Sequence, residues 1–414
     1  MKTFYGWRIV AAGGALQFLQ SLLLNQSFGV YLAVLVEDRG WSKTAVAGAA
    51  ALKSTEAAIL GPVLGWAVDR FGTQGIVRIG IVSFGIGFML LSWIDTLAGF
   101  YAAFVVVALG ASMFANSVVG VAIIHWFELR RARALSALQF GSAVGGLFVF
   151  LVAASIQAYG WRATAFASGL IVILVGWPLA RVIRSRPERH EAVDDLPPAP
   201  QDAPRAAVRG QAGFSVSEAL RTGAFWLIGL GHAFSLLVVT AFNVHAIAHI
   251  KEGLGYSLSL ATLVFTLVTV GQFGGVMLGW VIGDRFVKRK VAAACMLMHC
   301  AGLLMLTYAT GPVLLVVAAL VHGVAWGLRG PFMAAIRADY FGRSSIGMII
   351  GLSSLILVLG QIGGPIIAGA FADWTGNYRM GFTILALLAG VGSLFFLMAK
   401  RPRRGASAAP AEFS

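Results

Sequence analysis

The stretch Gly65-Trp66-Ala67-Val68-Asp69-Arg70-Phe71-Gly72 follows a long apolar segment, and a close copy follows another apolar segment later in the chain. The copy reads Gly279-Trp280-Val281-Ile282-Gly283-Asp284-Arg285-Phe286. Two further landmarks recur in the same order, an aromatic-Arg pair and an aromatic-Phe pair: Trp161-Arg162 with Tyr378-Arg379, and Trp126-Phe127 with Tyr340-Phe341. Three matched landmarks at nearly constant spacing indicate that one unit has been duplicated.

The apolar segments around these landmarks are long enough to cross a membrane. Of the 414 residues, 58% are hydrophobic and only 12% are charged, and one crossing takes about 20 apolar residues. The sequence predicts twelve spans, at 9–36, 44–68, 77–94, 97–124, 134–157, 161–183, 224–249, 258–282, 291–309, 312–337, 345–370 and 379–398. The predicted fold is an all-α membrane protein with twelve transmembrane helices in two pseudo-symmetric six-helix halves, which excludes a soluble enzyme domain of ordinary size.

One polar segment rich in proline separates the halves. The predicted organisation is a first half at 1–183, a linker at 184–221, a second half at 222–400 and a tail at 401–414. The chain has 31 Lys and Arg against 17 Asp and Glu, and most of the basic residues fall on the side of the linker and both termini. By the positive-inside rule this side is cytoplasmic, so we expect an inner (cytoplasmic) membrane protein with both termini in the cytoplasm. The same rule accounts for the basic excess without a nucleic-acid partner.

The duplicated Gly-x-x-x-Asp-Arg-x-Gly loop and the linker position resemble the major facilitator superfamily. Within that superfamily the chain resembles the oxalate/formate antiporter and monocarboxylate porter group in three stretches: Trp126-Phe127 before Arg130-Arg131-Ala132, 214–222 before Phe225-Trp226, and Trp326-Gly327 before Asp339-Tyr340-Phe341-Gly342. It departs from the group at Glu128, where proline is usual. It also has Val276 and Ser353 where the oxalate exchangers carry an arginine and a lysine, which disfavours a doubly charged substrate.

The resemblance implies a secondary active transporter of a small organic anion, a monocarboxylate or related carboxylate. It would work by proton symport or anion exchange, with alternating access around a midplane site in the lipid bilayer. We expect a monomer without cofactor or metal. Two alternatives stay open, a proton-driven exporter of hydrophobic compounds and a membrane sensor that binds a carboxylate without flux. No enzymatic activity is expected, because no plausible grouping of catalytic side chains is present.

Ionisable residues inside spans are the first candidates for the site, since each costs roughly 2.5 to 3.5 kcal/mol to insert. Lys53 and Glu56 lie three residues apart in the second span, on one face of a helix. They form either an internal ion pair or a switchable pair, in which an anion binds Lys53 and Glu56 then takes up a proton. The second interpretation makes Lys53 a substrate ligand and Glu56 the proton-coupling group.

Arg329, in Trp326-Gly327-Leu328-Arg329-Gly330-Pro331, is the predicted carboxylate anchor. A guanidinium pairs with a carboxylate through two hydrogen bonds and stays charged, and the neighbouring glycines and proline suggest a loosened helix that lines a cavity. The alternative is an arginine that extends to lipid phosphate. Superposing the repeats places Arg329 next to Asn116 of the fourth span, a second substrate-binding candidate.

Histidines and polar side chains inside other spans complete the predicted site. His245 is expected to bind substrate or carry a proton, unless it only packs. His249 follows it four residues later, a spacing typical of two metal ligands on a helix, but no further ligand lies nearby, so no metal is expected. His299 and His322, each alone on an apolar span, are assigned as packing or interfacial residues. The other substrate-binding candidates, each equally suited to an interhelical hydrogen bond, are Asn25, Tyr31, Gln272 and Gln361.

Small residues and polar stripes indicate how the spans pack. Gln17 and Gln20 of the first span share a polar stripe that should face protein or water and not lipid. Glycines at four-residue spacing are expected to let helices approach closely: Gly61, Gly65, Gly141, Gly145, Gly271, Gly275, Gly279, Gly360 and Gly364.

The repeated Asp-Arg loops are the predicted cytoplasmic gate. A carboxylate there can cap the N-terminus of a neighbouring helix or pair with the basic residues that follow the fourth span. The predicted gating residues are Asp69, Arg70, Arg130, Arg131, Asp284 and Arg285.

Overall fold

The computed structural model describes residues 4–187 and 213–402, which are almost entirely helical. Most of the predicted linker and the predicted tail beyond residue 402 lie outside the described residues. The first half contains α1 (Tyr5–Gln20), the π-helical turn η1 (Ser21–Asn25), α2 (Phe28–Arg39), α3 (Lys43–Phe71), α4 (Thr73–Leu91), α5 (Leu97–Met113), α6 (Asn116–Trp126), α7 (Arg131–Leu147) and α8 (Val149–Val182). The second half contains α11 (Gly223–Ala248), the π-helical turn η2 (His249–Gly253), α12 (Leu258–Ile282), α13 (Lys288–Thr307), α14 (Pro312–Phe341), α15 (Ile346–Thr375) and α16 (Arg379–Met398).

These helices confirm the twelve predicted spans. Ten helical segments in the described part are long and apolar enough to cross a membrane, and α3, which carries Lys53 and Glu56, is a further long helix. The segment Arg131–Val182 contains two of the predicted spans, divided at Gly160. Gly160 has φ 80° and ψ 159°, a backbone conformation that favours glycine, and the chain reverses there.

The end of the predicted linker next to the second half forms a short helix. Ser215 and Glu218 form a capping box that starts the short helix α10 (Val216–Leu220). The N–H of Phe214 donates to the carbonyl of Phe341 at 2.8 Å, and the two rings lie 6.0 Å apart. This end of the predicted linker is therefore docked on the second half.

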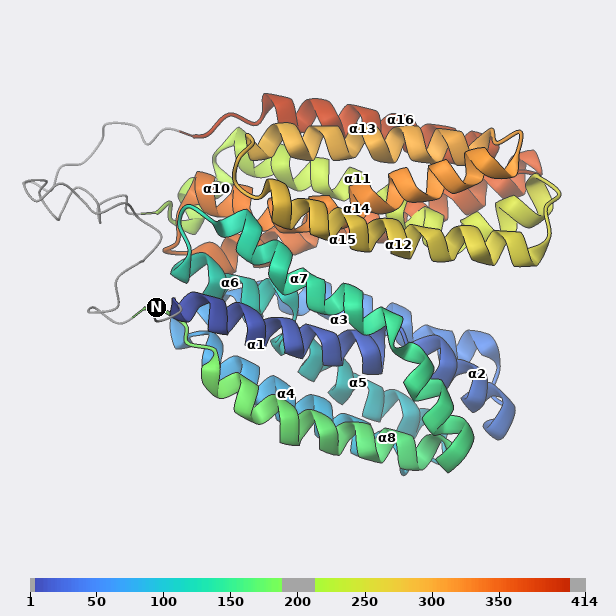
Figure 1. The fold of residues 1–414 in the computed structure, drawn as a ribbon, viewed down its shortest axis with the longest axis horizontal. Coiled ribbons are helices and arrows are strands. Elements are labelled where there is room, and N and C mark those ends of the chain that lie inside the picture. The colour runs from blue at the N-terminus through green and yellow to red at the C-terminus, as the bar shows by residue number, and fades with distance from the viewer. Residues whose placement is uncertain (1–3, 188–212, 403–414) are drawn as a thin grey trace, which may run out of the picture.

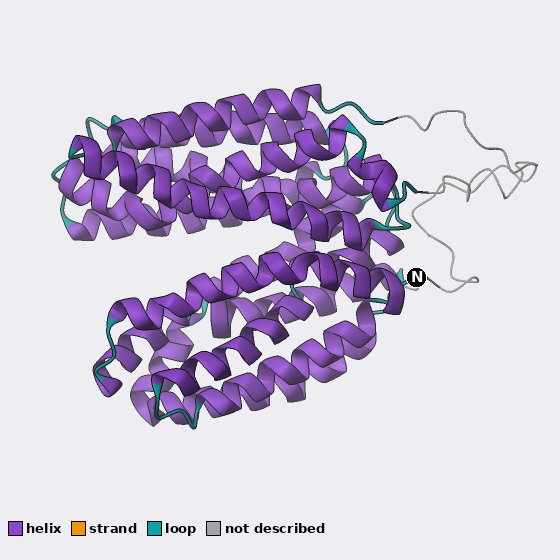
Figure 2. Cartoon of the chain, turned by 180° about the vertical axis from the view of Figure 1, so that it is seen from behind, coloured by secondary structure: helices purple, strands orange, loops and turns teal. Residues whose placement is uncertain are grey.

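Two helical bundles make up the molecule, one from each half (Figure 1). They meet at the end where the N-terminus lies, and the ribbons diverge toward the opposite end in both views (Figure 2). The contact between the bundles pairs α3 with α15 and α7 with α12, which are equivalent pairs in the two repeats. The duplication seen in the sequence therefore produces a pseudo-symmetric interface.

Glycines bring the helices of this interface together. A Cβ added at Gly65 would collide with the Gly347 carbonyl, and one at Gly61 would lie 3.1 Å from the Gly351 carbonyl. The predicted close approach is therefore present between α3 and α15. Other glycine runs pack helices within one half, as at Gly145, whose added Cβ would lie 2.6 Å from the Phe18 carbonyl of α1.

The fourth span is interrupted between α5 and α6. Phe114 and Ala115 have non-helical backbone angles, and this frees carbonyl groups inside the bundle. Gln17 donates to the Phe114 carbonyl at 2.6 Å, and Gln20 donates to the Ala111 carbonyl at 3.0 Å. Buried backbone groups in a membrane need such partners, so the polar stripe of the first span stabilises the break in the fourth.

Candidate functional site

Each half caps a helix of the other half at the end where the bundles meet. The Asp69 carboxylate, in the last turn of α3, accepts the N–H groups of Gly347 and Met348 at 2.9 and 2.8 Å. Asp284, directly after α12, likewise accepts two amides from the first turn of α7, at 3.1 and 3.3 Å. The first amides of a helix have no partner within the helix, and a carboxylate there also interacts favourably with the helix dipole. Pseudo-symmetry thus produces the same contact twice.

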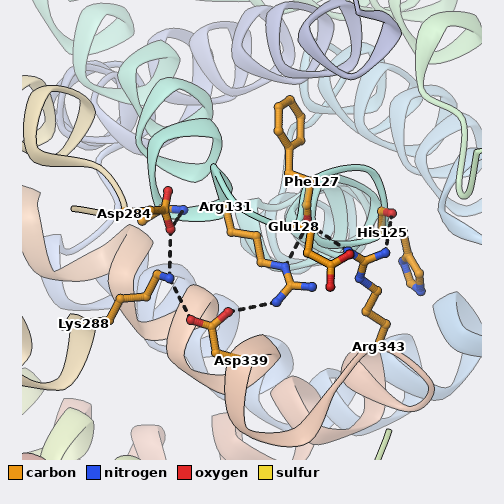
Figure 3. Close-up of polar contacts among 9 residues, drawn as sticks. His125, Phe127, Glu128, Arg131, Asp284, Lys288, Asp339 and Arg343 are labelled. Atoms are coloured by element: carbon orange, nitrogen blue, oxygen red, sulfur yellow. Dashed lines mark hydrogen bonds and ion pairs between the residues drawn. The ribbon is translucent and has the colours of Figure 1, made fainter. Parts of the chain in front are cut away.

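The Asp284 cap is part of a chain of ion pairs (Figure 3). Lys288 lies between two carboxylates, with its Nζ 2.8 Å from Asp284 and 2.7 Å from Asp339. Asp339 also pairs with Arg131 at 2.8 Å, and the Nε of Arg131 donates to the Phe127 carbonyl at 2.9 Å. The chain alternates in sign and connects α7 with both α13 and α14.

Arg343 forms a second connection between the halves (Figure 3). Its Nη2 lies 2.9 Å from the Glu128 carboxylate, and its guanidinium also donates to the carbonyls of His125 and Phe127, at 3.3 Å each. Glu128 is the residue that replaces the usual proline of the resembling group, so this departure adds an ion pair. We refer to these residues together as the contact layer: Asp69, Glu128, Arg131, Asp284, Lys288, Asp339 and Arg343.

The contact layer includes three of the six predicted gating residues. Asp69, Arg131 and Asp284 make contacts between the halves, and both aspartates cap helices as the sequence analysis anticipated. Arg70 and Arg285 are exposed, and Arg130 is the exposed N-cap residue of α7. Sequence reasoning missed the roles of the other four members, although Lys288, Asp339 and Arg343 all lie within or beside recognised landmarks. Their role in gating stays a prediction.

A cavity of about 100 Å³ lies between the halves, bounded by α3, the α5–α6 break and α15. Ala57 and Gly61 line it from α3, Ala115 and Ser117 from the fourth span, and Ser354 from α15. Ala57 adjoins Glu56 in sequence, and Ala115 and Ser117 flank Asn116. Neither Glu56 nor Asn116 is among the lining residues, so the role of each at the site stays a prediction.

The first half brings Lys53 and Asn25 together. The Lys53 Nζ donates to Asn25 Oδ1 at 2.5 Å, which joins two predicted substrate ligands from α3 and η1. Both carboxylate oxygens of Glu56 are buried and have no hydrogen-bond partner in the described part of the chain. Lys53 lies within electrostatic range of Glu56, but the direct ion pair, which was one of the two alternatives, is not formed between these described residues; the ammonium group donates to Asn25 instead.

Arg329 is buried inside the second half, with only 2% of its surface exposed. Its Nε and Nη1 are buried and have no hydrogen-bond partner among the described residues. The alternative of an arginine extending to lipid phosphate is therefore wrong. The expected loosening is also wrong, since α14 continues as one helix through Pro331; the break occurs at the equivalent place in the fourth span.

The surroundings of Arg329 are basic. Within its electrostatic range lie His232 of α11, His299 of α13, and His322 and Arg337 of its own helix. Arg337 is 4% exposed and donates to Ser353 Oγ at 3.1 Å and to a carbonyl of its own helix, while its Nη2 has no partner among the described residues. We refer to these five residues, two arginines that carry the charge and three histidines beside them, as the cationic cluster: His232, His299, His322, Arg329 and Arg337. A buried cation without a partner is unstable by several kcal/mol, so the cluster favours an anion.

Sequence reasoning missed most of the cationic cluster. His299 and His322 were expected to be packing or interfacial residues; both are buried, and the structure adds that their Nδ1 atoms lie 3.3 Å apart. His232 lies inside the predicted span 224–249, and Arg337 ends the predicted span 312–337, so an ionisable residue within a span was the available signal for both. The pseudo-symmetric position of Arg329 was a second signal, since it marked this depth of the bundle.

The remaining site candidates lie elsewhere. The His245 Nε2 lies 3.0 Å from the Pro365 carbonyl, and His249 Nε2 lies 3.2 Å from the Thr307 carbonyl, so the two imidazoles tie α11 and η2 to different helices. Tyr31 lines a small apolar space inside the first half and packs against Phe88. Gln272 and Gln361 are partly exposed, on α12 and α15. None of these positions brings a candidate to the cationic cluster, and their roles as substrate ligands stay predictions.

Comparison with known proteins agrees with this architecture. The sequence profile of the Major Facilitator Superfamily matches residues 14–281 and 228–413. Human monocarboxylate transporter 11 is 26% identical over 413 residues, covering 95% of this chain and 82% of that protein. The membrane sensor protein UhpC of Escherichia coli (strain K12) is 24% identical over 365 residues, covering 82% of this chain and 81% of that protein. Among solved structures, a double-Trp mutant of XylE has a TM-score of 0.77 at 15% identity and covers 96% of each chain, which supports the fold.

The duplicated loop, the twelve spans and the profile match over nearly the whole chain lead to one conclusion. This is a multi-pass membrane transporter and not an enzyme. Members of its family carry small molecules through a lipid bilayer and usually couple that movement to ions. The chain belongs to the Major Facilitator Superfamily.

Proposed function

We propose that this chain is a secondary active transporter of a small organic anion, a monocarboxylate or related carboxylate, moved with a proton or exchanged for another anion. The observation that carries the proposal is the buried Arg329 guanidinium, which has no hydrogen-bond partner at Nε and Nη1 in the described part of the chain. Each of these nitrogens can donate to the oxygen of an anion, and the guanidinium stays charged, so a carboxylate is a suitable partner. Substrate would supply the partner that the protein lacks.

The charges favour an anion over a hydrophobic compound. The second half buries two guanidinium groups, Arg329 and Arg337, and the first half places Lys53 beside Asn25. Glu56 is the one buried carboxylate found without a partner in the described residues. A proton-driven exporter of hydrophobic compounds would use Glu56 but would leave the buried cations uncompensated.

Glu56 supplies the proposed link to protons. An anion that approaches Lys53 weakens the attraction between Lys53 and the Glu56 carboxylate. Glu56 then binds a proton more readily, so anion and proton binding support each other. Release on the opposite side would reverse both steps.

Alternating access would occur at the contact layer. Its ion pairs and helix caps join the halves only at the end with the N-terminus, which we assign to the cytoplasm by the positive-inside rule. We accordingly place the protein in the inner membrane with both termini cytoplasmic. Opening this layer and closing the opposite end would expose the same site to the other side.

The names of the relatives support two candidate functions. Human monocarboxylate transporter 11 supports carboxylate transport. The membrane sensor protein UhpC, which matches most of the chain, supports a sensor that binds its ligand without flux. The two functions share a binding site and differ in whether the contact layer opens.

Counterflow in proteoliposomes tests the proposal. Proteoliposomes that contain the purified protein are loaded with unlabelled formate, acetate, propionate, lactate, pyruvate or oxalate. Uptake of the labelled compound is then measured with and without a pH gradient. We expect counterflow of at least one monocarboxylate, no preference for oxalate, and loss of the signal in Arg329→Gln but not in Arg221→Gln, which changes an exposed arginine outside the predicted site and gate. Binding to the wild type without counterflow would support the sensor, and neither binding nor flux would refute the proposal.

A further inference from the structure

Two histidines from adjacent helices form a buried pair inside the second half. His299 of α13 and His322 of α14 are both 0% exposed, and their Nδ1 atoms lie 3.3 Å apart. The ring centroids are 4.7 Å apart, and the His322 ring stacks on Phe242 of α11 at 4.6 Å. The Nε2 atoms of both rings are buried without a hydrogen-bond partner among the described residues. Packing alone does not require two facing imidazoles with two unused nitrogens.

The hydrogen bond between the rings determines which protons the pair can hold. In the neutral pair one ring donates its Nδ1–H to the Nδ1 of the other ring, so the donor ring has a bare Nε2. One additional proton binds at that Nε2, and no covalent bond breaks. The product is an imidazolium hydrogen-bonded to an imidazole, and the two rings can share its charge.

Arg329 is the charged group that acts on this pair. It lies within electrostatic range of both rings, and its positive charge opposes an added proton. The other titratable groups near this part of the cluster are Cys295, in range of Arg329 on α13, and His232 on α11. The packed helices α12 and α16 add no titratable side chain except Arg379 at the start of α16.

We propose that the His299–His322 pair is a second proton-binding site, which takes up a proton when a carboxylate neutralises Arg329. This inference rests on the proposed function, because it needs an anion at Arg329. Burial and the charge of Arg329 together keep the pair neutral, and the bound carboxylate cancels the second of these, so the anion and a proton enter the second half together. The pair is separate from Glu56, which belongs to the first half.

Calorimetry measures the proposed proton directly. Binding of the most active monocarboxylate from the counterflow panel is followed at pH 7 in two buffers that differ in ionisation enthalpy, which gives the protons taken up per bound anion. We expect His299→Asn and His322→Asn each to lose most of the uptake that remains in a Glu56→Gln background. His249→Asn is the matched control, since it also removes a buried histidine of this half, one that contacts Thr307 and not Arg329.

The outcomes separate this inference from the proposed function. Equal proton uptake in the two pair variants and the control would overturn the inference while leaving carboxylate binding intact. If no monocarboxylate of the panel binds the wild type, the proposed function fails instead. The measured quantity is the number of protons taken up per bound anion, so it does not depend on the yield of folded protein. If the asparagine variants do not fold, His299→Gln and His322→Gln replace them.

Discussion

The contact layer and the membrane interior differ in whether their charged groups have partners. In the contact layer, Asp284 accepts two amides and pairs with Lys288, while Asp339 bridges Lys288 and Arg131. In the interior, Glu56 and Arg329 lie buried with polar atoms that have no partner in the described part of the chain. The contact layer is complete by itself, whereas the interior lacks partners of both signs.

This difference indicates where external partners act. An open contact layer can exchange its helix caps for water, since it lies at the end of the spans. The interior has no such substitute, because a polar group without a partner there remains costly. Under the proposed function, the missing partners are a carboxylate for Arg329 and a proton for Glu56.

Removing the interior cation should have the largest effect. Loss of one member of a buried charge pair typically costs about 2 to 5 kcal/mol, which is tens to thousands of fold in affinity. Arg329→Gln should therefore abolish the rise in melting temperature produced by the substrate. Arg329→Lys keeps the charge but loses the planar fork, so we expect affinity to fall at least tenfold. Near-wild-type binding by the Lys variant would contradict the anchor.

Neutralising Glu56 should change the energetics of transport but not the anion site. A symporter of one proton can concentrate substrate about tenfold per pH unit of gradient. Glu56→Gln cannot release a proton, so we expect this accumulation to shrink while substrate-for-substrate exchange continues. Uptake into proteoliposomes with an imposed pH gradient checks this. Full accumulation by the variant would assign all of the coupling elsewhere, with the His299–His322 pair as the first candidate.

Breaking the contact layer at Asp284 should have the next largest effect. Asp284→Asn removes the charge from a helix cap and from the pair with Lys288, each worth about 1 kcal/mol. The population should shift away from the cytoplasm-closed state by roughly tenfold for each 1.4 kcal/mol lost. Labelling of Ser117→Cys, in the cavity between the halves, by an impermeant thiol reagent from the cytoplasmic side measures the shift. The parent chain with its native Cys295 and Cys300 supplies the background.

Asp69→Asn should produce a smaller shift in the same direction. The Asp69 carboxylate caps α15 and has no ion-pair partner among the described side chains, so the substitution weakens only the cap. In the asparagine variant, one amide of α15 faces the Nδ2–H₂ group in place of a carboxylate oxygen. We expect reduced transport, retained substrate binding and increased labelling of Ser117→Cys. Asp373→Asn, which changes an exposed aspartate near the opposite end of α15, is the control. Labelling and flux equal to the wild type would show that this cap does not hold the layer closed.

The sequence by itself determined the architecture of this protein. The twelve apolar segments, the repeated Asp-Arg loops and the polar linker are local patterns, and each depends on the length and composition of a short stretch. They were sufficient to predict two six-helix halves, and to give helix capping at Asp69 and Asp284 as one of two alternatives. They were also sufficient to identify Lys53, Glu56 and Arg329, because a charge inside an apolar span stands out wherever its side chain points.

Only the tertiary structure decided which of these groups have partners. The rotation of each helix in its bundle sets whether Lys53 meets Glu56 or Asn25, and it brings His299 and His322 together from separate spans. The break at Phe114 and Ala115 carries no proline or glycine at those positions and depends on glutamines of another helix. Such contacts join residues far apart in the chain, so local pattern does not encode them; the relative positions of packed helices determine them.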